Sequence, residues 1–141
     1  MRLWHKNLIK LLPRKQLVSQ WRECCLIAKL IYENGTPNHL LVNKILDYPL
    51  WHLCKYTHEV FEEMKKRGYQ VKAENFDKYI TYSMLDEGSM PTHEELFKGW
   101  HNDRYLTQCY YNLQEKYDCN GLTDDEWNTI CREIVFTEGG F

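Results

Sequence analysis

The sequence lacks the features that mark several common classes of protein. No run approaches the roughly eighteen apolar residues of a membrane span, and Met1 to Lys6 do not form the apolar stretch of a signal peptide. There is no glycine-rich phosphate loop and no nucleophile elbow, and none of the six cysteines forms a Cys-x-x-Cys pair. We therefore expect a cytoplasmic protein with reduced cysteines, no metal, no cofactor and no membrane partner.

The charge is small overall but unevenly distributed. The net charge is −2, yet residues 1–72 hold 13 Lys and Arg against 6 Asp and Glu, whereas residues 73–141 hold 5 against 14. The first fifteen residues contain five basic side chains and no acidic one. This asymmetry predicts either a basic face for an anionic partner or two halves that pair with each other.

Residues 16–33 predict a helix at the centre of the fold. They lie between Pro13 and Gly35 and contain neither Gly nor Pro. Leu26 and Leu30 fall opposite the broad apolar face, so we expect the helix to be covered on two sides. That face is formed by Leu17, Trp21, Cys24, Cys25, Ala28, Ile31 and Tyr32.

Glu23 is the acidic residue in the middle of this helix, beside Arg22. It shares a helical stripe with Ser19, Leu26 and Leu30, so we expect apolar surroundings that disfavour its charge. One interpretation is a structural ion pair or a partly exposed turn. The other is a catalytic carboxylate held on a rigid element.

The remaining pattern predicts an all-α fold in one domain over residues 1–141. No stretch alternates at period two, there is no internal repeat, and no linker divides the chain. Proline, glycine and capping residues set most of the expected boundaries. The expected helices cover residues 7–12, 36–46, 50–67, 72–82, a short segment from Thr92, 103–117 and 124–135, with a loop at 83–91 and a frayed tail at 137–141.

Two further groups of polar residues suggest sites. His58 and Glu62 lie one helical turn apart and could bind a metal, but no third ligand is apparent. His101 to Tyr105 begin a helix, either as a cap with an ion pair or as the wall of a binding site. A hydrolase built on His58, Glu62 and His101 is therefore one hypothesis.

Two motifs carry a resemblance to a known family. Arg22-Glu23 stands in the middle of the first long helix, and Lys66-Arg67-Gly68-Tyr69-Gln70-Val71 ends the second. Over roughly residues 1–72 the chain resembles the pyrimidine-dimer DNA glycosylases of the phage endonuclease V type. Beyond that it resembles a bacterial branch, through Trp100-His101-Asn102-Asp103-Arg104-Tyr105 and Asn112-Leu113.

The resemblance implies a DNA repair enzyme whose nucleophile is the α-amine of the chain. In that family the amine attacks the sugar C1′ of an exposed nucleotide, forms an imine and supports β-elimination. Free α-amines suit this role because their reference pKa of about 7.7–8.0 leaves a neutral fraction near pH 7. By the resemblance, Met1 supplies the amine and Glu23 the catalytic carboxylate.

The expected partner is damaged or abasic double-stranded DNA, with the oligomeric state left open. The resemblance assigns Arg2 to phosphate and Arg22 to phosphate or the target base. Arg14 and Lys15 are further expected phosphate contacts, and His39 and Arg104 are expected in the wall of the site. The chain also departs from the family. It begins with Met1-Arg2 where the phage enzyme exposes a small hydroxyl residue, it has Leu26 where the family has Arg, and it lacks the aromatic C-terminal cluster. An alternative is therefore a non-catalytic nucleic-acid- or protein-binding relative with the same fold.

Overall fold

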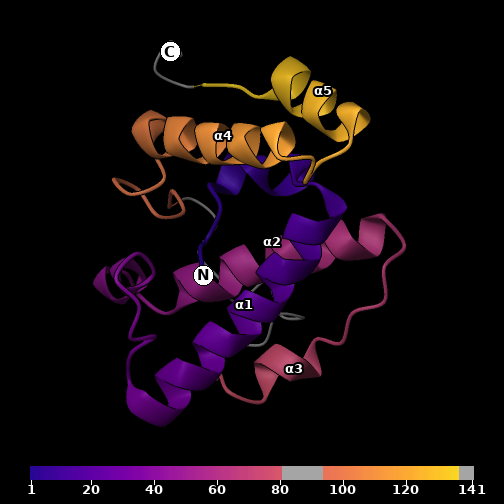
Figure 1. The fold of residues 1–141 in the computed structure, drawn as a ribbon. Helices are drawn as coiled ribbons and strands as arrows, with labels where there is room; N and C mark the ends of the chain where they lie inside the picture. The colour runs from indigo at the N-terminus through magenta and orange to yellow at the C-terminus, as the bar shows by residue number, and fades with distance from the viewer. Residues whose placement is uncertain (81–93, 137–141) are drawn as a thin grey trace.

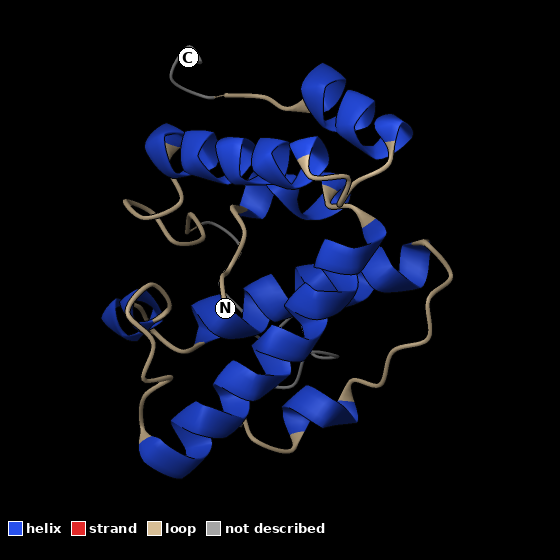
Figure 2. Cartoon of the chain, in the orientation of Figure 1, coloured by secondary structure: helices blue, strands red, loops and turns tan. Residues whose placement is uncertain are grey.

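The computed structural model describes residues 1–80 and 94–136, and these residues form only helices, turns and loops (Figures 1 and 2). This confirms the all-α class. Within the described residues no helix has the length and hydropathy needed to cross a bilayer. The elements are the 3₁₀ helices η1 (Lys6–Leu11) and η2 (Asn43–Asp47) and the α-helices α1 (Arg14–Asn34), α2 (Trp51–Lys66), α3 (Glu74–Asp77), α4 (Asp103–Asp118) and α5 (Asp124–Glu133).

Helix α1 crosses α2, and the apolar faces of the two helices form the centre of the core (Figure 1). Trp21 of α1 lies against Phe61 of α2, with ring centroids 5.8 Å apart. Helix α1 ends at Gly35, which adopts a φ of 75° that side chains disfavour. The prediction of a central helix is thus confirmed. The prediction that this helix is covered on two sides is wrong, because Leu26 is 42% exposed.

Helices α4 and α5 lie together above η1, and the N-terminal segment runs between α4 and α1 (Figure 1). Helix α5 begins with the predicted capping box, in which Thr123 and Glu126 exchange backbone–side-chain hydrogen bonds of 2.9 and 3.1 Å. Glu126 also accepts a 3.0 Å hydrogen bond from the amide of Arg14. It therefore caps the start of α1, where Pro13 offers no side-chain acceptor.

The prediction of a helix over residues 36–46 is wrong. Thr36 Oγ1 accepts a hydrogen bond from the amide of Asn38, and Asn43 Oδ1 accepts one from the amide of His39. Such short-range side-chain bonds compete with helical backbone bonds, and Asn38 has a φ of 51°. The segment is therefore a loop that leads into η2.

Two other predicted helices are shorter than expected or fall partly outside the described residues. The helix expected over residues 72–82 is reduced to α3, and residues 81–93 are not described. The described part of the segment from Thr92, residues 94–100, forms turns. The loop expected at 83–91 and the tail at 137–141 lie outside the described residues.

Candidate functional site

The buried side chain of Gln20 fixes the first residues of the chain against α1. Its Oε1 accepts a 2.8 Å hydrogen bond from the amide of Trp4, and its Nε2 donates a 2.8 Å bond to the carbonyl of Arg2. Two tyrosines complete the arrangement from other helices. Tyr56 donates to the carbonyl of Trp4 at 2.5 Å, and Tyr105 donates to the carbonyl of Leu3 at 2.6 Å. Residues 2–4 are therefore held from α1, α2 and α4 together.

Glu23 lies one turn after Gln20 and on the same side of α1. Its Oε2 accepts hydrogen bonds from Gln20 Nε2 at 3.3 Å and from the amide of Arg2 at 3.4 Å. The carboxylate therefore lies directly beside the peptide bond that follows Met1. Its neighbours are hydrogen-bond donors, so the apolar surroundings expected for Glu23 are wrong.

Met1 and Glu23 line the same pocket, which has a volume of about 430 Å³. This volume falls in the range of small-molecule and cofactor sites. Of the predicted site residues, Arg2, Lys15 and His39 line it as well. Its other walls come from Trp4, Gln16, Ser19, Leu41, Asn112 and Lys116.

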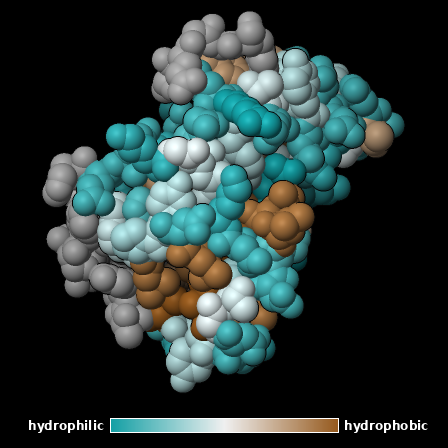
Figure 3. All heavy atoms as spheres, turned by 90° about the vertical axis from the view of Figure 1, so that its left-hand side faces the viewer, coloured by the Kyte–Doolittle hydropathy of each residue, from teal (hydrophilic) through white to brown (hydrophobic). Residues whose placement is uncertain are grey.

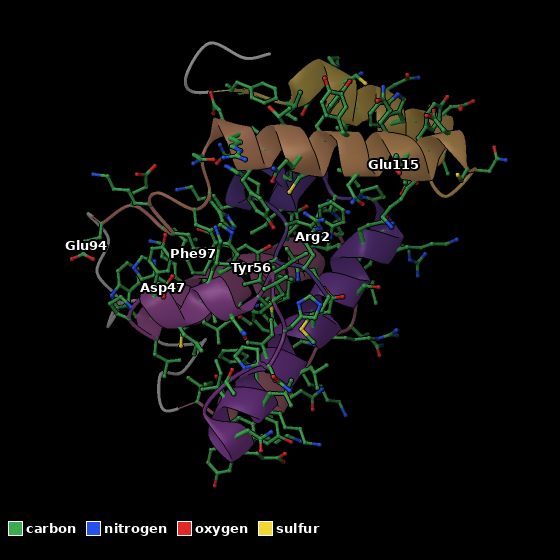
Figure 4. All side chains as sticks on the ribbon, turned by 60° about the vertical axis from the view of Figure 1, so that its left-hand side comes forward. Arg2, Asp47, Tyr56, Glu94, Phe97 and Glu115 are labelled. Carbon is green, nitrogen blue, oxygen red and sulfur yellow. The ribbon has the colours of Figure 1, made fainter. Side chains whose placement is uncertain are left out.

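Arg2, which is labelled in Figure 4, lines this pocket and also a second one of about 600 Å³ that Arg104 lines as well. The guanidinium carbon of Arg2 lies 5.3 Å from the centre of the Trp4 ring and 6.0 Å from that of Tyr105. These cation–π contacts favour one orientation of the guanidinium. Leu41 and Asn112 also line both pockets, so the two pockets adjoin each other, and together they are called the recess.

Cationic side chains surround this recess. Lys15, Lys116 and Arg2 line the first pocket with Glu23 as its acidic member, and Lys44 joins Arg2 and Arg104 in the second. Glu115 also lines the second pocket, so the two pockets together have five cations and two carboxylates. A concave surface with this excess of cations suits a phosphate-bearing ligand. In the first pocket, the carboxylate of Glu23 can stabilise a group that becomes positive.

His5 and His101 lie against Tyr105, which lines the second pocket. Their rings are stacked with centroids 5.1 Å apart, and the amide of Lys6 donates a 2.9 Å hydrogen bond to His101 Nδ1. Burial, with smaller effects from neighbouring charges, lowers the pKa of His5 to about 4 and that of His101 to about 2. Both rings are therefore neutral near pH 7, and they join η1 to the start of α4.

The structure places two predicted DNA contacts outside the recess. The guanidinium of Arg14 lies 5.1 Å from the centre of the Tyr69 ring. Arg22 is exposed and lines a separate pocket of about 280 Å³ with Leu26. The metal site considered at His58 and Glu62 has no third ligand in the part of the chain that the structure describes. His58 Nε2 lies 3.8 Å from Glu62 Oε1, and the described residues contain no group of three or more His, Cys, Asp or Glu able to hold a metal.

Sequence reasoning missed the residue that organises the site. Gln20 is fully buried between Leu17 and Trp21 on the core face of α1. A polar residue on an apolar helical face needs a partner, and this was the available signal. Lys116 and Asn112 of α4 were also missed as pocket residues, because their position depends on how α4 packs over the N-terminal segment.

Part of the chain matches a known protein family. The family model of pyrimidine dimer DNA glycosylases matches residues 1–77, more than half of the chain. The matched segment contains Met1, Glu23 and the two crossing helices α1 and α2, whereas α4 and α5 lie beyond it. The chain has no match among curated proteins and none among solved structures.

Proposed function

The chain belongs to the pyrimidine dimer DNA glycosylase family, and on this premise we propose that it is a DNA glycosylase with abasic-site lyase activity. The nucleophile is the α-amine of Met1 and the catalytic carboxylate is that of Glu23. The observation that carries the proposal is the pocket that both residues line, with the Glu23 carboxylate 3.4 Å from the amide of Arg2. The substrate is damaged or abasic double-stranded DNA, and the protein acts in the cytoplasm without a metal or cofactor.

The reaction follows from an amine and a carboxylate that meet at one sugar. The lone pair of the neutral amine forms a bond to C1′, and the bond from C1′ to the base breaks as the base leaves with a proton. At an abasic site the same attack expels water. The C1′–O4′ bond then breaks as the nitrogen lone pair forms the C=N bond of the imine and O4′ takes up a proton. The imine acidifies the proton at C2′, so removal of that proton expels the 3′ phosphate, and hydrolysis of the imine regenerates the amine. Glu23 stabilises the positive charge that develops at C1′ and transfers protons.

The cations around the recess would hold the phosphates on both sides of the reacting sugar. Arg2 and Lys15 line the pocket itself, and Arg104 lies in the adjoining one. His39 forms part of the wall that faces the nucleotide. Arg14 and Arg22 are exposed on α1, so we propose that they contact phosphates farther along the strand. Because C1′ is shielded inside a duplex, the target nucleotide must leave the stack to reach Met1.

Borohydride reduction tests this proposal, because it converts an imine with abasic DNA into a stable covalent adduct. We expect an adduct with the wild-type protein, a folded Glu23→Gln protein that forms little or none, and no adduct after N-terminal extension. Ser19→Ala is the matched control, since Ser19 lies on the same helix and lines the same pocket. A wild-type protein without an adduct, or an undiminished adduct with the extended chain, would refute the proposed chemistry.

A non-catalytic DNA-binding relative is the second candidate. It is favoured by Leu26, which is 42% exposed where the family carries an Arg. In that case the wild-type protein would form no adduct but would still bind DNA. Its affinity would fall steeply with salt, because each phosphate contact releases counterions.

A further inference from the structure

Two adjacent leucines project from the loop before η2 at the edge of the candidate active site. Leu40 is 87% exposed and Leu41 is 52% exposed, and Leu41 lines both pockets of the recess. Figure 3 views the side on which this loop lies in Figure 1 and shows hydrophobic residues at the surface between hydrophilic ones. Exposing two large aliphatic side chains beside each other forgoes the stabilisation that burial would provide.

The backbone of this loop holds the two leucines outward. The amides of Val42 and Asn43 donate hydrogen bonds of 3.0 and 2.8 Å to the carbonyl of His39, and Asn43 Oδ1 accepts a 3.1 Å bond from the amide of His39. Val42 is fully buried directly after the two leucines. The turn that carries Leu40 and Leu41 is therefore anchored on its C-terminal side. Such an ordered turn keeps its conformation when it binds a ligand.

The charges around Leu40 and Leu41 indicate which kind of ligand these side chains contact. Lys44 and Arg104 line one of the two pockets that Leu41 borders, and Lys15 lines the other, so both pockets beside Leu41 contain cations. Cations attract phosphates, and an apolar group between two rows of phosphates faces the bases. Apolar side chains that enter a base step unstack it and bend the duplex.

We propose that Leu40 and Leu41 form a wedge that enters the base stack of double-stranded DNA beside the nucleotide admitted to the pocket. Leu40 occupies the gap in the stack, and Leu41 lies at the mouth of the pocket between the stack and the reacting sugar. This inference rests on the proposed function, because the wedge acts by keeping the sugar available to Met1. Leu40 is thus a positioning residue, and it does not touch the reacting atoms.

Single-turnover borohydride trapping on duplex and single-stranded abasic DNA tests the wedge, since a single strand has no stack to open. We expect Leu40→Ser to slow trapping on the duplex by about tenfold, which corresponds to about 1.4 kcal/mol of lost transition-state stabilisation. Trapping on the single strand should stay at the wild-type rate. Leu40→Met should restore the duplex rate, and Val135→Ser, at a site 67% exposed outside the recess, should behave as wild type.

A fluorescent base gives a second measurement that needs binding but no chemistry. When 2-aminopurine stands beside the target nucleotide of the duplex, wild type should raise its fluorescence by unstacking it, and Leu40→Ser should raise it much less. Equal trapping by wild type and Leu40→Ser on the duplex, or equal slowing on both substrates, would overturn the wedge while leaving the proposed function intact. If the wild-type protein forms no adduct on either substrate, the proposed chemistry fails, and the 2-aminopurine signal then decides the wedge alone.

Discussion

Gln20 should couple the position of the chain terminus to the activity of Glu23. Its side chain bonds the amide of Trp4, the carbonyl of Arg2 and the carboxylate of Glu23. Gln20→Ala leaves the first two groups without these partners, and each unsatisfied buried group costs about 1–3 kcal/mol. We therefore expect the free energy of unfolding to fall by about 2–6 kcal/mol, as measured by urea titration of tryptophan fluorescence.

The larger consequence is expected in the reaction. Without Gln20 the first residues lose their alignment with α1, so borohydride trapping on abasic DNA should slow by about tenfold or more, even under conditions where the variant is fully folded. Tyr105→Phe is the matched control. It removes the 2.6 Å hydrogen bond to the carbonyl of Leu3 without touching Glu23, so it should lower stability by about 1–3 kcal/mol and slow trapping much less. A folded Gln20→Ala protein that traps DNA at the wild-type rate would refute this reasoning.

Three further outcomes follow from the fold. Trp21→Ala should lower the free energy of unfolding by about 3–5 kcal/mol, because Trp21 is buried against Phe61; a urea midpoint close to wild type would contradict this. The lowered pKa of His101 means that folding favours its neutral form, so its contribution is intact above pH 6.5 and is lost as the pH falls. Between about pH 7 and pH 5 this loss should lower the free energy of unfolding by about 2 kcal/mol, and His5 should act in the same direction. In urea titrations, the free energy of unfolding of the His101→Gln protein should therefore depend less on pH than that of the wild type. An equal pH dependence in the two proteins would contradict this prediction. Thr123→Ala removes a cap of α5 and should cost about 1 kcal/mol, whereas no loss in thermal unfolding would show that the capping box is dispensable.

The long helices could be predicted because residues near their ends specify where each helix begins and ends. Gly35 and Gly68 mark the ends of α1 and α2, and both have a positive φ. Asn102 and Thr123 accept the amide hydrogen bonds that begin α4 and α5. The segment 36–46 was missed because its conformation depends on side-chain hydrogen bonds that propensity does not reveal.

The candidate site could be predicted only in part. The pairing of Met1 with Glu23 came from the family resemblance, since no periodicity relates a chain terminus to a residue on a later helix. Gln20 was missed because its partners are backbone groups of the N-terminal segment, which become neighbours only in the folded chain. Lys116 was missed for the same reason, because its place in the pocket depends on the packing of α4.

The most direct test of the account is to locate the amine that forms the covalent bond to DNA. Lys15 and Lys116 line the same pocket as Met1, so each is a rival nucleophile at the same sugar. Peptide mapping by mass spectrometry, after borohydride reduction with abasic DNA, distinguishes the three. We predict that the reduced sugar is found on the α-amine of Met1; its attachment to the side chain of Lys15 or Lys116 would contradict the account.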